Sequence, residues 1–315
     1  MNIGIMKNKT PLVSVLLPAY NHENYVQEAI KSIISQTYRY IELIVLDDGS
    51  KDSTWLRIQE LMLDCEQRFE RIVFETQENK GTCLTLNRLI DLCSPESSYV
   101  YIIASDDIAD YTAIEKQVDF MEDNSKYGLC VGDNAIIDSE GTVCYWDNCR
   151  NNVYEKEKAT YITFADFLQK ASGVSFHSRK FGQYKYLYKG NHVPNGYLIR
   201  KSVFDCFRFT KEAPLEDYNL MLHISKYYKM KFLDDVLFYY RWHGSNSAQN
   251  IQKMISMTKI TTNYENNLLK KISVFKTIPS ASFFILVLKG KQNPFIIFML
   301  YIYKRIKQLR KILEL

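Results

Sequence analysis

The chain has 315 residues, of which 46% are hydrophobic, and this is enough apolar material for one large α/β domain or two smaller ones. Its net charge of +4 is unevenly spread, because residues 271–315 hold nine Lys and Arg against one Glu. That tail therefore carries +8, which leaves −4 for residues 1–270. A basic surplus confined to one end does not predict a nucleic-acid partner.

Cysteine usage and the first residues predict which compartment the chain occupies. The seven cysteines form no CxxC pair, and an odd number argues against a fully paired secreted scaffold, so reduced thiols are expected. Residues 1–10 contain no apolar run typical of a secretory signal. We therefore expect the active domain to face the cytoplasm.

Strands and helices alternate through the first part of the chain. Strands are predicted at 13–17, 41–46, 72–74 and 99–104, and helices at 25–34, 53–69, 82–92 and 112–122. The strands are almost continuously apolar, as in parallel sheets that are covered on both faces. This alternation predicts an α/β fold with right-handed crossovers and a mostly parallel central sheet flanked by helices.

The pattern changes after residue 129, where 132–142 predicts a short hairpin and 173–196 is rich in Gly, His, Lys and Tyr. A helix carrying residues 215–220 and a strand at 232–240 follow. We predict a domain at 1–250, with a nucleotide-binding half at 11–130 and an acceptor and catalytic half at 131–250. Residues 251–315 are predicted to form a helical, basic and apolar extension.

The carboxyl-terminal tail has two apolar runs, 283–288 and 295–303, which are separated by the polar stretch 289–294. A bilayer span needs about 20 apolar residues, so a transmembrane helix is not expected. Ile302, Ile306, Leu309 and Leu313 form one apolar stripe among basic residues, which is typical of a helix lying on a membrane surface. A terminal helix docked on the domain is the alternative.

Paired acids follow two of the predicted strands at the edge where a ligand of an α/β sheet binds. Asp47 and Asp48 end one strand and could accept hydrogen bonds from a base or a ribose, with Tyr20 as a stacking surface. A simple turn is the alternative for this pair. Asp106 and Asp107 end another strand, where their mutual repulsion favours binding of Mg²⁺ or Mn²⁺, and a solvated acidic turn is the alternative.

Three further groups could carry chemistry. Lys80 lies in an Asn-Lys-Gly turn and could meet a phosphate or a ribose. Glu216 and Asp217 begin a helix, where acids are favoured by the helix dipole alone or could serve as a general base. Arg241 and His243 could face phosphate or metal, whereas His22, His177, His192 and His223 are interpreted as structural.

The order of these motifs resembles glycosyltransferase family 2 over roughly residues 11–247. The matching segments are PAYN at 18–21, LDDGSKDST at 46–54, NKG at 79–81, ASDD at 104–107, ED at 216–217 and YRWH at 240–243. The resemblance implies a GT-A, Rossmann-like fold and an inverting mechanism. It also implies a nucleotide-diphosphate sugar donor, with a UDP-sugar as the expected donor, and Mn²⁺ or Mg²⁺ as cofactor.

The resemblance also implies roles for individual residues. Pro18, Tyr20 and Asp47 would hold the base, with Asp48, Asn79, Lys80 and Asp106 near the ribose or diphosphate. Asp106 and Asp107 match the family's DXD position, with Ser105 where the first Asp is usual, and Asp107 would bind the metal. Asp217 of the Glu216-Asp217 pair would be the base, His243 a further metal ligand and Arg241 a phosphate ligand.

Two departures from the family pattern refine the expected activity. The Arg or Trp that often follows the Glu-Asp pair is absent, and no QxxRW signature of processive synthases occurs. Single sugar additions are therefore expected. The basic tail predicts a lipid-linked saccharide acceptor in bacterial surface-polysaccharide assembly (lipopolysaccharide, O-antigen or capsule), with the enzyme on the inner face of the cytoplasmic membrane. Transfer to a protein or soluble acceptor, and a non-catalytic sugar- or nucleotide-binding module, are the alternatives.

Overall fold

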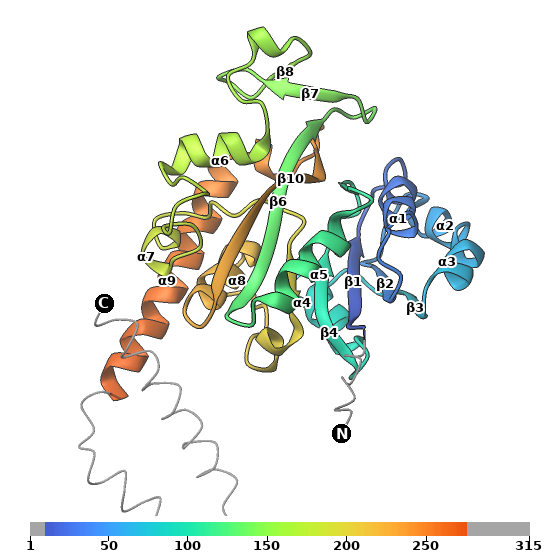
Figure 1. The fold of residues 1–315 in the computed structure, drawn as a ribbon, viewed down its shortest axis with the longest axis horizontal. Coiled ribbons are helices and arrows are strands. Elements are labelled where there is room, and N and C mark those ends of the chain that lie inside the picture. Colours follow the sequence, from blue (N-terminus) through green and yellow to red (C-terminus); the bar gives the residue numbers. More distant parts are fainter. Residues whose placement is uncertain (1–9, 276–315) are drawn as a thin grey trace, which may run out of the picture.

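The computed structural model describes residues 10–275 and shows one large sheet with helices on both faces (Figure 1). The strand order is β3-β2-β1-β4-β9-β6-β10-β5, and the short strands β7 and β8 are attached to β6. The predicted α/β class is confirmed, with parallel pairing in the first half and mixed pairing in the second.

The first half holds the parallel part of the sheet. It comprises β1 (Leu12–Ala19), β2 (Ile41–Asp47), β3 (Arg71–Thr76) and β4 (Ser97–Ile102). β1 pairs with β2 on one side and with β4 on the other, with Ala19 opposite Asp47 and Leu16 opposite Ile102. The carboxyl ends of these three strands therefore meet at one edge, as the sequence predicts.

Both faces of this sheet are covered by helices. The helices are α1 (Val26–Ile34), α2 (Thr54–Gln59), α3 (Met62–Arg68), α4 (Thr82–Asp91) and α5 (Ala113–Asp123). Along β1, Leu16 packs in one apolar cluster while Val15 and Leu17 pack in the other, on the opposite face. Each such fully buried side chain contributes about 1.5–3 kcal/mol, which explains the continuous apolar run.

One predicted helix differs from the structure. The helix expected over 53–69 is broken into α2 and α3 at Glu60 and Leu61. Ile58, Leu61 and Cys65 nevertheless all pack in the same apolar cluster on either side of the break. The sequence therefore predicted the helical segment but not the interruption.

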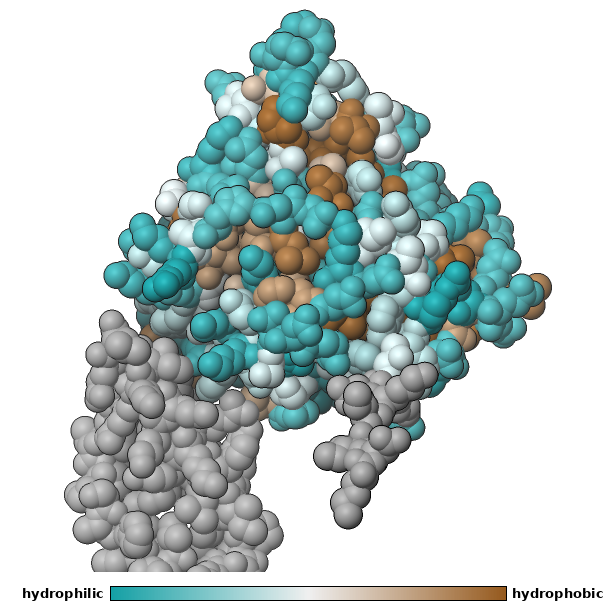
Figure 2. Space-filling model, viewed as in Figure 1, coloured by the Kyte–Doolittle hydropathy of each residue, from teal (hydrophilic) through white to brown (hydrophobic). Residues whose placement is uncertain are grey.

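The second half completes the sheet with longer strands. Its strands are β5 (Ile108–Ala109), β6 (Tyr127–Ile137), β7 (Val143–Trp146), β8 (Asn152–Val153), β9 (Leu198–Arg200) and β10 (Lys229–Arg241). β9 lies antiparallel between β4 and β6 and joins the two halves. The predicted hairpin is confirmed, with its turn between β6 and β7. Figure 2 shows apolar side chains gathered over β6 and β10, with hydrophilic ones around them.

The helices of the second half are α6 (Phe164–Ser172), α7 (Tyr184–Leu187), α8 (Glu216–Ser225) and α9 (Ile251–Phe275), with 3₁₀ turns at Lys156–Lys158, Lys201–Asp205 and Ser247–Gln249. α9 is docked on this half: Glu265 is buried and pairs with Lys226 at 2.5 Å, and Thr261 accepts a hydrogen bond from the Leu215 amide at 3.1 Å. The beginning of the predicted extension is thus part of the folded body.

Within residues 10–275, no helix combines the length and the apolar composition needed to cross a bilayer. The apolar runs of the tail, and its apolar stripe among basic residues, lie outside the described residues. The predicted membrane-surface helix therefore stays a prediction.

Candidate active site

The two acids after β2 hold the loops at the edge of the sheet. The Asp47 carboxylate accepts hydrogen bonds from the Ser50 side chain and, at 3.0 Å, from the Thr76 hydroxyl. The Asp48 carboxylate accepts from the backbone N–H groups of Lys80 and Gly81, both at 2.9 Å. Both carboxylates are buried and hold this turn, and their contacts with a base or ribose stay a prediction.

Glycine is required in this turn. Gly49 has φ +74°, and a Cβ built on it would lie 2.8 Å from the Gln77 carbonyl oxygen and 2.9 Å from the Asn79 nitrogen. Only a residue without a side chain allows the two loops to approach so closely. The approach brings the exposed side chains of Asn79 and Lys80 to the same edge as exposed Tyr20 and half-buried Pro18.

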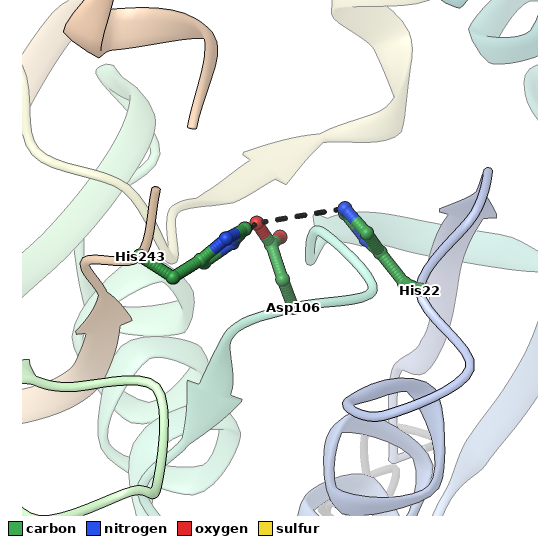
Figure 3. Close-up of side chains that lie close together, drawn as sticks. All are labelled: His22, Asp106 and His243. Atoms are coloured by element: carbon green, nitrogen blue, oxygen red, sulfur yellow. Dashed lines mark hydrogen bonds and ion pairs between the residues drawn. The ribbon is translucent and has the colours of Figure 1, made fainter. Parts of the chain in front are cut away.

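Three side chains from distant segments converge beside this edge (Figure 3). His22 follows β1, Asp106 follows β4 and His243 follows β10. Asp106 Oδ2 lies 3.0 Å from His243 Nε2 and 3.9 Å from His22 Nε2. One ligand atom of each residue lies within 4.8 Å of the others, a spacing at which the three could hold a metal ion. We name these residues the His22–Asp106–His243 cluster.

The protonation states of the cluster suit a cation. Burial lowers the pKa of His22 and so favours the neutral imidazole. Burial acts to raise the pKa of Asp106, but the hydrogen bond with His243 and the charges that the two imidazoles carry when protonated outweigh it and keep the pKa below its usual range. Metal ligands must be deprotonated, and both of these shifts act in that direction.

Asp107 does not belong to the cluster, although the sequence analysis assigns the metal to it. Its buried carboxylate accepts a hydrogen bond from the Arg241 backbone N–H at 2.9 Å. Burial and the neighbouring charge of Asp106 raise its pKa well above the usual range. Asp106 is the carboxylate that faces the two imidazoles, and the assignment of the metal to Asp107 stays a prediction.

The sequence analysis predicts that Arg241 binds phosphate. In the structure its side chain is buried, and its hydrogen-bond donors are used within the protein. Its Nε donates to the Asp106 carbonyl at 2.8 Å, and Nη1 donates to the carbonyls of Asp138 and Ser139 at 3.2 and 3.1 Å. Nη2 forms an ion pair with Glu28. Arg241 therefore fixes the segment that carries Asp106 instead of binding phosphate.

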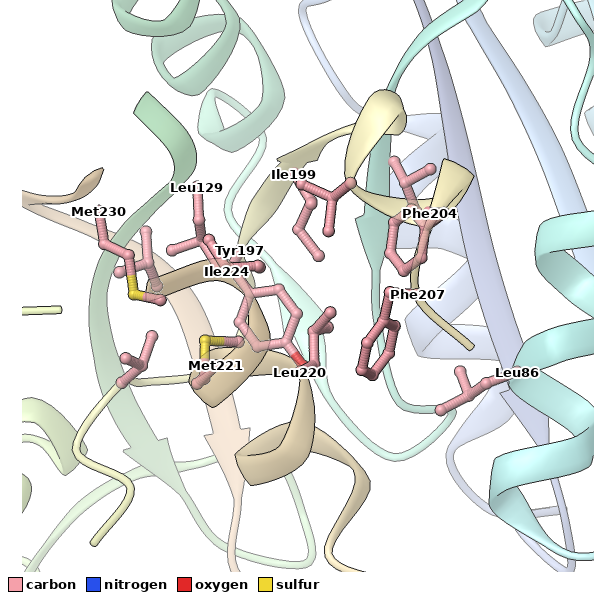
Figure 4. Close-up of a cluster of buried hydrophobic side chains, with 14 of the residues drawn as sticks. Leu86, Leu129, Tyr197, Ile199, Phe204, Phe207, Leu220, Met221, Ile224 and Met230 are labelled. Atoms are coloured by element: carbon pink, nitrogen blue, oxygen red, sulfur yellow. The ribbon is translucent and has the colours of Figure 1, made fainter. Parts of the chain in front are cut away.

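The acid pair stands at the start of α8. The apolar residues of α8, among them Leu220, Met221 and Ile224, are buried against the sheet (Figure 4), which fixes the position of its first turn. Asp217 Oδ2 accepts a hydrogen bond from Asn191 Nδ2 at 2.9 Å.

Both acids are hard to ionise. Burial and then the charge of Asp217 raise the pKa of Glu216 to about 7. Burial also raises the pKa of Asp217, although hydrogen bonds from the Tyr218 N–H and Asn191 oppose it. A carboxylate whose pKa lies near neutral pH is suited to accept a proton from a substrate hydroxyl.

A buried tyrosine connects the acid pair with the cluster electrostatically. Burial raises the pKa of Tyr240, and the charges of Asp107, Asp106 and Asp217 raise it further. Tyr240, near the end of β10, is thus within electrostatic reach of the acids that follow β4 and of Asp217.

Residues 14–185 match the family described as Glycosyl transferase family 2, which is more than half of the chain. The chain belongs to glycosyl transferase family 2. It is 35% identical over 131 residues to an uncharacterized glycosyltransferase of Haemophilus influenzae (strain ATCC 51907 / DSM 11121 / KW20 / Rd), covering 42% of this chain and 50% of the relative. It is 30% identical over 159 residues to TuaG of Bacillus subtilis (strain 168), a glycosyltransferase provisionally named for teichuronic acid biosynthesis, covering 47% and 61%. The chain thus matches about half to three fifths of the length of these relatives.

A solved structure of this fold also resembles the family 2 chain. Residues 1–349 of TarS from S. aureus, in complex with UDP-GlcNAc, match it with a TM-score of 0.54 at 15% identity. The match covers 76% of this chain and 60% of TarS 1–349. This likeness confirms the predicted GT-A fold.

Members of family 2 with a GT-A fold commonly use a divalent metal, and the His22–Asp106–His243 cluster fits one. Two imidazole nitrogens and one carboxylate oxygen are donors that first-row transition metals accept. His243 is in the cluster, as the sequence analysis predicts. His22 is also in the cluster, although the sequence analysis interprets it as structural.

A topological signal for His22 was nevertheless present in the family 2 sequence. Because β1 and β4 are neighbours in a parallel sheet, the segments that follow them lie at the same edge. His22 and Asp106 occupy those two segments. The other histidines do not join the cluster: His192 is fully buried against Phe176 and Phe181, and His177 is exposed beside Asp234.

Proposed function

We propose that the chain is an inverting glycosyltransferase that moves one sugar from a nucleotide-diphosphate sugar, expected to be a UDP-sugar, to a saccharide acceptor. One observation carries this proposal: Asp106 and two imidazoles form a metal-type cluster at the edge of the sheet, in a chain that also holds a buried acid pair with raised pKa at the start of α8. Family membership supports the reaction class, and the likeness to TarS in complex with UDP-GlcNAc supports the donor class.

The donor would bind at the edge formed by the ends of β1, β2 and β4. Exposed Tyr20 can stack on the base, and Asn79 and Lys80 can meet the ribose or diphosphate. Asp47 and Asp48 would act by holding these loops. When bound at the cluster, the cation would offset the charge that develops on the departing diphosphate.

The acceptor hydroxyl would lose its proton to the acid pair. The sequence analysis assigns this role to Asp217, which Asn191 holds in a defined orientation. A single displacement at the anomeric carbon breaks the bond to the diphosphate and forms the bond to the acceptor oxygen, so the configuration inverts. A module that only binds sugar has no need of buried carboxyl groups with raised pKa, and the presence of Glu216 and Asp217 supports catalysis over binding alone.

The acceptor and the location of the enzyme are part of the same proposal. We propose bacterial surface-polysaccharide assembly, which the name of the TuaG relative supports. The +8 charge of residues 271–315 supports a lipid-linked acceptor at the anionic inner face of the cytoplasmic membrane. The first relatives extend beyond the matched region, so this assignment rests on shared sequence over part of their length.

The test is a screen of the purified full-length protein against nucleotide sugars, with nucleoside diphosphate release as the readout. We expect release from one donor class, its loss in excess EDTA, and an inverted anomeric configuration in the product by NMR. Asp217→Asn is the catalytic control, and His177→Ala, at an exposed site, is the matched neutral control. Donor binding without nucleoside diphosphate release in the presence of any acceptor tested would favour a non-catalytic module.

A further inference from the structure

Helix α8, which begins with the acid pair, is anchored at its first residue by a side chain of α9. Its N-cap residue is Leu215, whose apolar side chain makes no capping hydrogen bond. The N–H of Leu215 donates to Thr261 Oγ1 at 3.1 Å, and Thr261 is fully buried. The residue that immediately precedes Glu216 and Asp217 is therefore fixed by a hydroxyl from a distant helix.

The same helix also holds α7 in place (Figure 1). The buried carboxylate of Glu265 accepts a hydrogen bond from the Tyr184 hydroxyl at 2.7 Å, and Asn266 Oδ1 accepts one from the Tyr188 hydroxyl. Tyr188 is the residue at which α7 ends, shortly before Asn191. The loop that carries Asn191 is thus tied to α9 at its beginning.

Asn191 passes this support on to the acid pair. Its Oδ1 accepts a hydrogen bond from the Val193 N–H at 3.1 Å, so its amide nitrogen is left to donate to Asp217. The Tyr218 hydroxyl of α8 donates to the Tyr188 carbonyl at 3.2 Å and closes the connection between α7 and α8. The first turn of α8 is therefore held from two directions, and both supports lead back to α9.

This arrangement matters because a general base works only within hydrogen-bonding reach of the proton that it accepts. A misplacement of about 1 Å can cost ~10²-fold in rate. Helix α9 lies beyond residues 14–185, which match the family, and beyond the last motif that resembles it. Its contribution is therefore a property of this chain's own packing.

We propose that α9 belongs to the catalytic unit and that Thr261 is a positioning residue, which sets the place of Asp217 through the backbone of Leu215. This inference rests on the proposed function in taking the acid pair as the proton acceptor. The positioning itself can be measured without turnover.

The experiment compares full-length variants by nucleoside diphosphate release from the UDP-sugar that the screen identifies, and by UDP titration. Thr261→Val keeps the branched shape and removes the hydroxyl, so kcat should fall by ~10-fold or more while KM for the donor and UDP affinity stay nearly unchanged. Thr261→Ser restores the hydroxyl and should recover most of kcat. Thr258→Val is the matched control on α9, because the Thr258 hydroxyl donates to the Met254 carbonyl of the same helix at 2.8 Å.

A second variant and a second measurement test the same inference. Tyr188→Phe breaks the other link to α9 without removing the Thr261 contact, so it should also lower kcat and leave UDP affinity unchanged. Hydrogen exchange followed by mass spectrometry should show faster deuterium uptake at residues 215–219 in Thr261→Val than in the wild type, Thr261→Ser or Thr258→Val.

Unchanged kcat in folded Thr261→Val, an equal loss in Thr258→Val, or a parallel loss of UDP affinity would overturn the inference. Unchanged exchange at residues 215–219 in Thr261→Val would overturn it even in a protein without measurable turnover. If the wild type released no nucleoside diphosphate, the proposed function alone would be refuted, and faster exchange in Thr261→Val would still support the positioning of the acid pair.

Discussion

Glu216 should destabilise the folded protein at alkaline pH, and Glu216→Gln should relieve this. Burial and the charge of Asp217 raise the pKa of Glu216 from an ordinary 4.5 to about 7. At 1.36 kcal/mol per pKa unit, ionising this side chain in the folded state costs roughly 3 kcal/mol more than in the unfolded chain. Gln keeps the shape of the side chain and removes the charge.

The pH dependence follows from the direction of the shift. Above about pH 7 the carboxyl group is ionised in both states, so the folded state bears the full cost. Between about pH 7 and 4.5 the cost declines, and below 4.5 the group is protonated in both states and the cost disappears. Glu216→Gln should therefore exceed the wild type in stability by up to roughly 3 kcal/mol at pH 8 and match it near pH 4.5.

The assay is urea unfolding of both proteins at pH 8, 6 and 4.5, with Glu66→Gln, at an exposed carboxylate on α3, as the matched control. The control should follow the wild type at every pH. A stability difference that is absent at pH 8, or that stays constant across the pH range, would refute the reasoning that the site stores electrostatic strain. Gain of stability with loss of activity would show that the charge is kept for function.

Further predictions concern the base, its neighbour, the tight turn and the tail. Asp217→Asn should lower turnover by ~10²-fold or more with donor affinity nearly unchanged, measured by steady-state kinetics and donor titration. If Glu216→Gln abolishes turnover while Asp217→Asn spares it, Glu216 is the base instead of Asp217. Asn191→Leu removes a hydrogen bond to the ionised form of Asp217, so the acidic limb of the profile of kcat/KM against pH should move to higher pH. An unmoved limb would show that this hydrogen bond does not set the pKa of the base. Gly49→Ala should destabilise the fold by more than ~1 kcal/mol in urea unfolding, since it combines positive φ with a clash against backbone atoms. Deleting residues 280–315 should abolish salt-sensitive binding to anionic vesicles and spare donor binding; loss of cooperative melting would instead make the tail part of the core.

The sequence predicted best what depends on local pattern and strand order. The apolar runs that lead to Asp47 and to Asp106 identified the two strands that flank β1, and a parallel sheet places their ends at one edge. The start of α8 at Glu216 was also predictable from its acids and the apolar residues that follow. These features depend on residues close together in the chain.

What the sequence did not predict depends on partners far apart in the chain. Arg241 looked like a phosphate ligand because its type suits one, but Glu28 and the carbonyls after β6 occupy its donors. Asp106 and Asp107 are adjacent, and only the position of the Arg241 backbone decides which one faces the imidazoles. No local pattern carries that information.

The way β9 joins the sheet limits how such enzymes can be recombined. The strand from residues 198–200 pairs with both β4 and β6, and β5 from the first half pairs with β10 of the second. The two predicted halves therefore share one continuous sheet through these strand pairings. A chimera that exchanges residues 131–250, the half predicted to bind the acceptor, would have to match the partners of β9 and the Glu28 site for Arg241.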